Sequence, residues 1–482
     1  MRFNTLTPYV LVVIMLLLMI NISCNDDTID LSKGEEEQSE NIEIGLPHIL
    51  INTNGTTIVD DPKIIADINI SEDGIVSFTG KIGIEIRGAS SQMFPKKSYG
   101  LETRDSNNQD LDVSLLGLPE EEDWILHAPY SDKSLMRNKL TYDLARDLGH
   151  YASRSVFVEL TINNEYKGVY VFMEKLKRDD LRLDISKLKP DENSGEDITG
   201  GYILKIDKTA GNNVGGGGFN DQNSFVSNHT PNYGSSTAKI HFLYEYPDAE
   251  DITSEQKTYI SNYISDFEDA LKGTDFQNPN SGYASYIDIP SFIDFFLINE
   301  LSNNVDGYRI STYMHKDKNK KLKMGPIWDF NLAFGNADYC NGGDTNVWAY
   351  KFNERCGGDG LLVPFWWNRL LQDPAYVTQV KQRCTELRSN NFAEVAIMSK
   401  LDSYRTIINA EGAINQNFET FYIPAPRGEI LDLNGNKLAE SILEPYLFLN
   451  QKKINEENIT IYKQFISFNF NDLTNAEIDN FF

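Results

Sequence analysis

Two aspartates near the middle of the chain, Asp306 and Asp329, are the residues whose spacing best suits chemistry. The pattern predicts that an apolar helix ends shortly before Asp306 and that a strand follows over about residues 308–315. The polar sequence KDKNKK then turns the chain, and a second strand from Leu322 leads to Asp329. Because two strands that run out and back return the chain to its starting point, we expect the two carboxylates to lie close together.

Carboxylates paired in this way suit phosphoryl transfer, in which one acid positions the attacking hydroxyl and the other holds magnesium on the phosphates. Protein kinases use the same order: a catalytic aspartate, a hairpin, and then the aspartate of an Asp-Phe-Gly metal site. Here Asp329 and Phe330 are followed by Gly335, which is a looser version of that motif. Aspartates beside strands are also common turn formers, so the residues alone leave both interpretations open.

The composition sets outer limits on the class of protein. A chain of 482 residues with 40% apolar and 11% aromatic residues can bury the core of one large domain or of two ordinary ones. The formal net charge of −27 argues against a nucleic-acid partner, because phosphate contacts depend on clustered lysines and arginines. An acidic protein that handles a nucleotide must therefore bring in magnesium or gather basic residues locally. The many carboxylates and 24 tyrosines also allow a carbohydrate hydrolase, although no spacing identifies its acid pair.

The first residues have the pattern of an export signal. Arg2 precedes an apolar run over residues 9–20, which is too short to span a bilayer comfortably. Ser23 stands directly before Cys24, as in the lipobox of bacterial lipoproteins. We therefore expect a lipoprotein signal peptide over residues 1–23 and a lipid on Cys24.

The segment around the predicted cleavage site suggests where the protein acts. Asn21 stands where leucine is more usual, so a plain signal peptide or membrane anchor stays open as the alternative. Residues 24–44 are polar and acidic with little to bury, which predicts a disordered tether. Together these segments predict a protein outside the cytoplasm that a lipid anchors to a membrane of the cell envelope, at the outer membrane or the cell surface.

Alternation of apolar and polar residues predicts that the N-terminal part of the chain is rich in strands. Short strands are expected between residues 46 and 104. A hairpin that turns at Asn163 and Asn164 and a strand over residues 200–207 should follow. These strands, with the helices described next, predict an α+β fold.

Helical spacing predicts the remaining elements. One helix is expected within residues 131–150, with Ser131 or Asp132 as its cap, and another begins at Pro290. From residue 361 onward the chain is mainly helical, with a helix around residues 383–408. The predicted parts of the chain are the signal peptide (1–23), the tether (24–44), an α+β body (45–420) and a C-terminal extension packed on that body (421–482).

Three cysteines remain after Cys24, namely Cys340, Cys356 and Cys384. Cys340 and Cys356 bracket a stretch rich in glycine and asparagine that a disulfide could close in an oxidising compartment. A zinc site is the rival interpretation, but the sequence has no CxxC motif and no histidine close by. Two unpaired thiols are the remaining alternative.

Six blocks of sequence, in order along the chain, resemble the spore-coat-protein-H-type (CotH) family of atypical kinases. The resemblance extends from about residue 45 to residue 420 and includes AINQNFETF near its end. Six blocks in one order are hard to produce by chance. The blocks are RGASSQMFPKKSYGLETRD, LMRNKLTYDLA, YKGVYVFMEKL, GGYILKID, NELSNNVDGY and GPIWDFNLAFG.

The resemblance implies an atypical, reduced kinase-like fold with two lobes. It also implies binding of ATP with Mg2+ or Mn2+ and phosphorylation of serine or threonine on protein partners. By position, Asp306 in NNVDGY matches the family's catalytic aspartate, and Asp329 in IWDF matches its metal-binding aspartate. The sequence does not identify the protein that accepts the phosphate.

The resemblance also suggests residues that contact the nucleotide. Lys97 follows the RGASSQMFP loop and is the candidate for a phosphate-contacting lysine, with Lys96 as its rival. Glu174 could pair with that lysine or reach magnesium, and an ordinary salt bridge at the end of a strand is the alternative. Arg87 and Arg137 are expected either to bind phosphate or to brace loops.

Two positions depart from the family pattern. Ser311 stands five residues after Asp306, where an asparagine usually binds magnesium, and Asn331 stands where a further aspartate is common. A hydroxyl and an amide are weaker magnesium ligands than a carboxylate. The alternative to an active kinase is therefore a catalytically weak or inactive kinase-fold lipoprotein that acts as a binding or adhesion scaffold.

Overall fold

The computed structural model describes residues 45–209, 218–231, 233–234 and 236–409, and the backbone of β13 (Ile430–Leu431) and β14 (Lys437–Ala439), which pair antiparallel. Cys24, the predicted signal peptide and tether, and most of the predicted C-terminal extension lie outside these residues. Within the described ranges, no helix has the length and apolar character that crossing a membrane requires. Helices and strands are mixed along the chain, which confirms the predicted α+β class.

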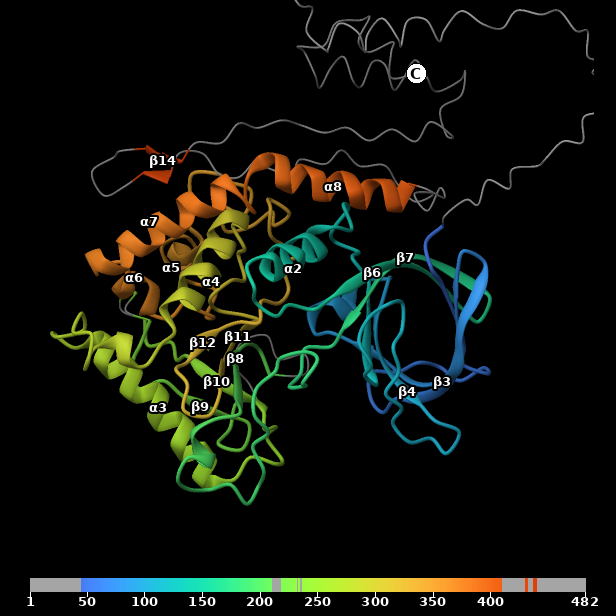
Figure 1. Cartoon of the computed structure of the whole chain (residues 1–482), viewed down its shortest axis with the longest axis horizontal. Helices are drawn as coiled ribbons and strands as arrows, with labels where there is room; N and C mark the ends of the chain where they lie inside the picture. The colour runs from blue at the N-terminus through green and yellow to red at the C-terminus, as the bar shows by residue number, and fades with distance from the viewer. Residues whose placement is uncertain are drawn as a thin grey trace, which may run out of the picture. The chain divides into compact units, whose positions relative to one another are not determined.

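Seven strands form a closed barrel (Figure 1). Neighbours pair antiparallel except at the closure, where β1 lies parallel to β6 and Ile49 is opposite Leu160. Alternate residues of the strands bury a core of aliphatic and aromatic side chains, in which Trp124 stacks on Phe172. In the order of their pairing, the strands are β1 (His48–Asn52), β2 (Ile64–Glu72), β3 (Ile75–Arg87), β4 (Ser98–Arg104), β5 (Asp123–His127), β7 (Glu165–Glu174) and β6 (Ser155–Ile162).

A second sheet of five antiparallel strands has two unlike faces. On its strand β8, Tyr202, Leu204 and Ile206 belong to the main hydrophobic core, which includes the helices. Ile203 and Lys205 alternate with them and therefore point to the opposite face. In the order of their pairing, the strands are β12 (Lys323–Met324), β11 (Thr312–Lys316), β8 (Tyr202–Ile206), β10 (His241–Tyr246) and β9 (Ser224–Val226).

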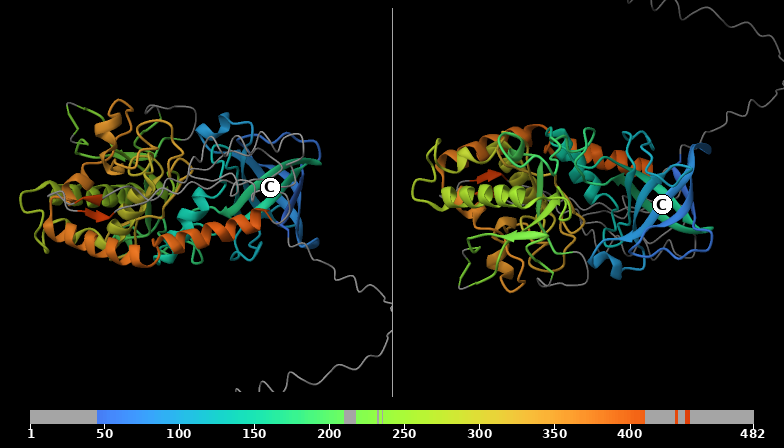
Figure 2. Two further views of the ribbon diagram at one scale, coloured as in Figure 1. Left: turned by 90° about the horizontal axis from the view of Figure 1, so that it is seen from above. Right: turned by 90° about the horizontal axis from the view of Figure 1, so that it is seen from below.

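Helices pack on the apolar face of the second sheet (Figures 1 and 2). Helix α3 begins at a capping box formed by Thr253 and Gln256, and its Tyr259 stacks on Tyr202 of β8. Helix α4 has Pro290 in its first turn, as predicted. The α-helices of the described chain are α2 (Arg137–Asp147), α3 (Ser254–Lys272), α4 (Ile289–Ser302), α5 (Phe352–Cys356), α6 (Trp366–Leu370), α7 (Pro374–Ser389) and α8 (Glu394–Asn409).

Two of the helix predictions need correction. Helix α2 begins only at Arg137, because the Asp132 carboxylate instead accepts hydrogen bonds from the amides of Ser134 and Arg137. The predicted cap therefore belongs to a turn before the helix. The helix predicted around residues 383–408 is in fact two helices, α7 and α8, since Asn390 leaves the helical conformation with φ −133° and ψ −104°.

The turn between β6 and β7 helps to close the barrel. Asn163 and Asn164 have φ values of 51° and 66°, which confirms the predicted tight turn. The side chain of Asn163 accepts a hydrogen bond of 2.9 Å from the amide of Thr53 and donates one of 2.9 Å to the Thr53 hydroxyl. Asn163 thus ties the hairpin to the residue that follows β1.

We expect Asn163→Ala to destabilise the protein more than Asn164→Ala does. Each substitution places alanine in a left-handed conformation, at a cost of about 1 kcal/mol. Only Asn163→Ala also removes two hydrogen bonds, each worth about 1 kcal/mol. Chemical denaturation should therefore show a difference of about 2 kcal/mol between the variants in the free energy of unfolding. Equal losses would show that the Asn163 side chain does not stabilise the closure.

Candidate active site

Asp306 lies in a turn that follows the C-terminus of α4. The helix ends at Asn303, which has φ 45° and whose side-chain amide donates to the carbonyl oxygens of Asn341 and Gly342. The side-chain oxygen of Asn304 then accepts a hydrogen bond of 3.2 Å from the Asp306 amide. These bonds fix the turn that presents the Asp306 side chain, which is 14% exposed.

The predicted hairpin between the two aspartates is confirmed. Strands β11 and β12 pair antiparallel, with Met314 opposite Met324. Strand β11 begins at Thr312 rather than near residue 308, because Tyr308 and Ser311 have φ values of 71° and 49°, which are incompatible with a strand. After β12 the chain reaches the second aspartate.

Asp329 has an unusual backbone conformation, with φ 61°. Its amide donates to the Tyr142 hydroxyl at 3.1 Å, and the amide of Phe330 donates to the side-chain oxygen of Asn138 at 2.6 Å. Both acceptors belong to α2, so this helix holds the chain at Asp329. Positive φ values outside glycine are uncommon and occur often at functional sites, where the surrounding structure enforces them.

The charges that act on the Asp329 carboxyl include that of Asp306, so the two aspartates lie in the same part of the structure. Burial raises the pKa of Asp329, and repulsion by Asp306 and by Asp207 raises it further, to about 7. Attraction by Arg87 and Lys208 opposes this rise. Asp306, Asp207, Arg87 and Lys208 each therefore lie within electrostatic range of Asp329. We call the three carboxylates of Asp207, Asp306 and Asp329 the aspartate cluster.

Asp207 is a member of this cluster that the sequence analysis missed. It directly follows β8, and its carboxylate accepts hydrogen bonds from the amides of Lys208, at 2.8 Å, and of Ser311. Burial nevertheless raises its pKa. A signal was present, since Asp207 ends the block GGYILKID. Only the pairing of β8 with β11 shows that it lies beside the turn that follows Asp306.

Basic side chains approach the aspartate cluster from both sheets. Arg87, at the end of β3, has its guanidinium carbon 5.8 Å from the centre of the Trp328 ring. Lys205, on β8, forms an ion pair of 2.7 Å with Glu245 on β10. Burial lowers the pKa of Lys205, but attraction to Glu245 and Asp207 outweighs it, and the pKa is raised. Basic side chains thus gather near the aspartates, as we expect of an acidic protein that handles a nucleotide.

The two lysines predicted to contact phosphate have backbone partners elsewhere. Lys97 Nζ donates to the carbonyl oxygen of Gln92, in the loop before β4. Lys96 Nζ donates to the Val169 carbonyl oxygen at 2.6 Å and lies 4.5 Å from the centre of the Tyr170 ring. Burial lowers the pKa of Lys96 to about 8. The assignment of Lys97 or Lys96 as a phosphate contact stays a prediction, and Lys205 and Lys208 are lysines whose charges act on Asp207.

Glu174 and Arg137 have the bracing roles that the sequence left open. The buried Glu174 carboxylate forms an ion pair of 2.5 Å with Arg154 and accepts a hydrogen bond of 3.4 Å from the Tyr151 hydroxyl. Arg137 Nε donates to the carbonyl oxygen of Ala333 at 3.1 Å, which joins α2 to the loop after the second aspartate. Because Glu174 is held by these partners at the end of β7, we do not include it in the site.

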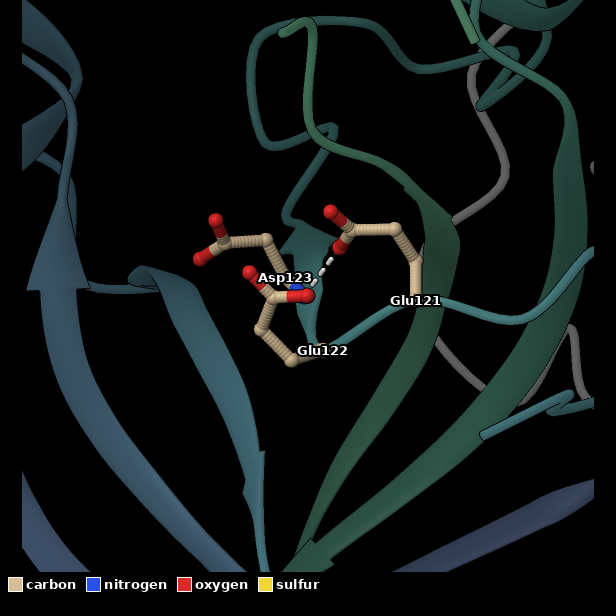
Figure 3. Close-up of side chains that lie close together, drawn as sticks. All are labelled: Glu121, Glu122 and Asp123. Atoms are coloured by element: carbon tan, nitrogen blue, oxygen red, sulfur yellow. Dashed lines mark hydrogen bonds between the residues drawn. The ribbon is translucent and has the colours of Figure 1, made fainter. Parts of the chain in front are cut away.

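A second group of carboxylates, Glu121, Glu122 and Asp123, lies at the start of β5 (Figure 3). One oxygen of each lies within 4.8 Å of the others, a spacing that a metal ion could use. However, Lys177 Nζ lies 2.5, 2.8 and 3.0 Å from the three carboxylates, and Arg182 lies 3.1 Å from Glu121. These two side chains, with Lys175 at 3.2 Å from Asp123, balance the charge of the group, so we interpret it as a salt-bridge network that joins β5 to the segment after β7.

The aspartate cluster does not share this 4.8 Å spacing, but its carboxylates are of the donor type that a hard divalent cation prefers. Magnesium prefers carboxylate oxygens and usually keeps several waters, so one or two carboxylates together with substrate phosphates suffice to bind it. A divalent cation held by these residues would offset repulsion of the kind that raises the pKa of Asp329. The donor set therefore fits Mg2+ or Mn2+.

The fold and the site define a class of α+β protein in which a helix end and a hairpin bring aspartates together beside basic side chains. Comparison with known proteins identifies the family. The model of the family described as CotH kinase protein matches residues 84–470, and the chain belongs to this family. The chain is also similar to the inner spore coat protein H of Bacillus subtilis (strain 168), with 29% identity over 119 residues. This match covers 25% of the chain and 29% of that protein.

Asp329→Asn should stabilise the cation-free protein, and more so at pH 8 than at pH 5. Between the ordinary carboxyl pKa of 3.8 and the folded value of about 7, the Asp329 carboxyl holds a proton only in the folded state. The wild-type protein therefore loses stability relative to the variant as pH rises through this interval, and the loss levels off above it.

Thermal unfolding in a chelator at the two pH values measures this effect. We expect the gain in melting temperature to be larger at pH 8 by about 2 °C or more. Asp402→Asn, at an exposed position on α8, is the matched control and should show no such pH dependence. A gain that is equal at both pH values would contradict the raised pKa.

Proposed function

We propose that this protein is an atypical protein kinase that transfers the γ-phosphate of ATP to serine or threonine hydroxyls of other proteins. The observation that supports this most is the surroundings of Asp329, where burial and repulsion by Asp306 and Asp207 raise its pKa to about 7. Strongly shifted carboxyl groups of this kind gather at functional sites. Membership of the CotH kinase family supports ATP as the donor and Mg2+ or Mn2+ as the cofactor.

Each aspartate has its own role in the proposed reaction. Asp306 accepts the proton of the attacking hydroxyl, because it occupies the catalytic position and its side chain is partly exposed. Asp329, with Asp207 beside it, holds the divalent cation, which when bound neutralises charge on the phosphates. Asp329 must first lose its proton, so the affinity for the cation should increase with pH up to about 7.

Lys205 and Arg87 contact the phosphates in this proposal, in place of Lys97 and Lys96. The ion pair of 2.7 Å with Glu245 holds the Lys205 ammonium on the face of the second sheet beside the aspartates. Protein kinases use a comparable lysine–glutamate pair at the nucleotide phosphates. The proposal therefore includes the two-lobed, kinase-like arrangement that the family resemblance implies.

We also propose that the protein acts outside the cytoplasm, held at the cell envelope by a lipid on Cys24. The export signal and acidic tether over residues 1–44 support this location. A disulfide between Cys340 and Cys356 agrees with an oxidising compartment. The expected substrates are proteins rather than nucleic acids, because the net charge of −27 repels phosphate backbones.

A scaffold that binds without transferring phosphate is the second candidate, and two side chains favour it. Ser311 has a hydroxyl where an amide ligand is usual, and its backbone amide donates to Asp207. The side-chain amide of Asn331 donates to the Ser131 hydroxyl at 3.2 Å and so helps to hold a loop. A site that binds one cation where kinases bind two would transfer phosphate slowly or only bind the nucleotide.

Transfer of label from ATP tests the proposed function directly. We expect the full-length protein, in detergent with Mg2+ or Mn2+, to label itself or an added protein mixture on serine or threonine. Asp306→Asn should lower the rate by about 100-fold or more without weakening ATP binding, because a general base acts in the transition state. Asp402→Asn serves as the matched control. Binding of ATP without transfer by the wild-type protein would select the scaffold.

Lys205→Met should raise the KM for ATP more than Lys97→Met does. The first variant loses a charged contact to phosphate, which corresponds to about tenfold or more in binding. The matched variant should stay within about twofold of the wild type, since Lys97 Nζ binds the backbone of Gln92. Equal effects of the two substitutions on KM would contradict the assignment of Lys205.

A further inference from the structure

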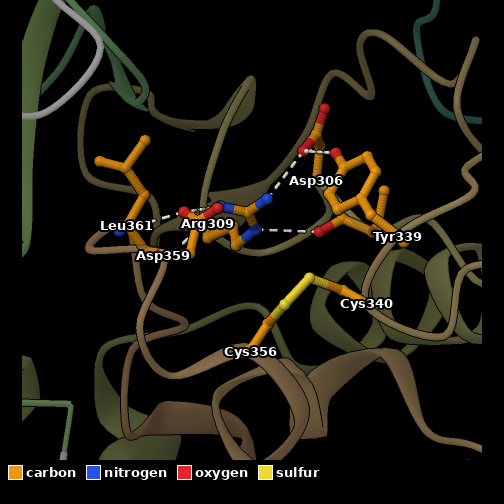
Figure 4. Close-up of a disulfide and its surroundings, with 8 residues drawn as sticks. Asp306, Arg309, Tyr339, Cys340, Cys356, Asp359 and Leu361 are labelled. Carbon is orange, nitrogen blue, oxygen red and sulfur yellow. Dashed lines mark hydrogen bonds and ion pairs between the residues drawn. A yellow bond between two sulfur atoms is a disulfide. The ribbon is translucent and has the colours of Figure 1, made fainter.

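A disulfide lies beside the turn that carries Asp306 (Figure 4). The sequence left the pairing of Cys340 with Cys356 open, and the structure confirms it, with the Cα atoms 5.7 Å apart. Tyr339 directly precedes the first cysteine. Asp359 follows the second, and its amide donates to the Cys356 carbonyl oxygen at 3.0 Å. The disulfide thus joins two segments, and both of them reach the turn.

The first segment reaches the carboxylate directly. The Tyr339 hydroxyl donates to Oδ1 of Asp306 at 3.4 Å. The same loop is tied to the end of α4, because the Asn303 side-chain amide donates to the carbonyl oxygens of Asn341 and Asp344 at 3.1 and 3.2 Å. Movement of this loop would therefore change both the turn and the carboxylate.

The second segment reaches Asp306 through Arg309. Arg309 Nη2 lies 3.0 Å from Oδ1 of Asp306, and Nη1 lies 2.7 Å from Oδ1 of Asp359. Nη1 also donates to the carbonyl oxygen of Leu361 at 3.2 Å, and the guanidinium carbon lies 3.9 Å from the centre of the Phe352 ring. The Arg309 side chain is 1% exposed, so these contacts fix its position.

These contacts orient the Asp306 carboxylate. In the part of the chain that the structure describes, Arg309 and Tyr339 both donate to Oδ1, which leaves Oδ2 for the substrate hydroxyl of the proposed reaction. Misplacement of a catalytic group by about 1 Å can cost about 100-fold in rate. Asp329 is held by Tyr142 of α2 and Lys205 lies on β8, so a loose disulfide segment should affect transfer rather than nucleotide binding.

We propose that Arg309 and Tyr339 are positioning residues for Asp306 and that the Cys340–Cys356 disulfide makes phosphate transfer depend on redox state. This proposal rests on the proposed kinase function. A dithiol that supplies two electrons and two protons converts the S–S bond into two thiols and is itself oxidised to a disulfide. The two segments are then no longer joined covalently, and the carboxylate loses its fixed orientation.

Treatment of the full-length protein with dithiothreitol tests the redox dependence. We expect kcat to fall about tenfold with the KM for ATP unchanged, and to recover on re-oxidation. The double variant Cys340→Ser/Cys356→Ser should have the same low kcat with and without reductant. Cys384→Ser removes a free cysteine and should respond like the wild type. An unchanged kcat in fully reduced wild-type protein overturns the proposal.

Asp359→Asn tests the relay through Arg309 without touching the disulfide. The Asp359 side chain is 30% exposed, so the protein should fold normally. Its loss should lower kcat by about threefold to tenfold and leave the KM for ATP unchanged, whereas Asp402→Asn should change neither. A higher KM with an unchanged kcat would assign the segment to nucleotide binding and overturn the positioning role.

Hydrogen exchange separates this proposal from the kinase function. On reduction, the amides of residues 303–311 should exchange faster, while those of the barrel strands keep their rates. A wild-type protein that transfers no phosphate would overturn the kinase function. Hydrogen exchange needs no transfer activity, so it would still decide whether the disulfide controls the turn that carries Asp306. Faster exchange throughout the chain, or none in the turn, overturns the positioning proposal.

Discussion

Repulsion between carboxylates that the fold holds together is the constraint on which the rest of the site depends. Burial and the charges of two other aspartates raise the pKa of Asp329 to about 7. Hydrogen bonds hold the segments that carry Asp329 and Asp207 and so oppose their separation. Tyr142 of α2 accepts from the Asp329 amide, and Asp207 accepts from the amide of Ser311. A divalent cation is the simplest charge that offsets the repulsion without moving the chain.

The two sheets contribute different side chains to the surroundings of the aspartate cluster. The second sheet packs one face on helices and carries ionisable groups on the other, among them the ion pair of Lys205 with Glu245, and Asp207 acts on the charge of Lys205. The barrel contributes Arg87 from the end of β3. The overall charge of −27 therefore says little about this site, where basic side chains and acids are interleaved.

The features predicted from sequence are those that depend on residues close together in the chain. The hairpin before Asp329 and the turn at Asn163 follow from local spacing and turn chemistry, and the structure confirms both. Asp207 was missed because it joins the cluster only through the pairing of β8 with β11. Lys205 was not considered for a similar reason, since its partner Glu245 lies on β10 and no local motif connects the two strands.

Family membership and geometry answer different questions about this chain, because a fold alone does not fix a function. In the proposed mechanism, binding of the nucleotide depends on Asp329, held by α2, and on the lysine of β8. Transfer depends in addition on the orientation of Asp306, which Arg309 and the disulfide-linked segments control. Binding tolerates small displacements, whereas a general base must be placed within a fraction of an ångström. An enzyme and a scaffold built on this fold would therefore differ mainly in how firmly those segments hold one carboxylate.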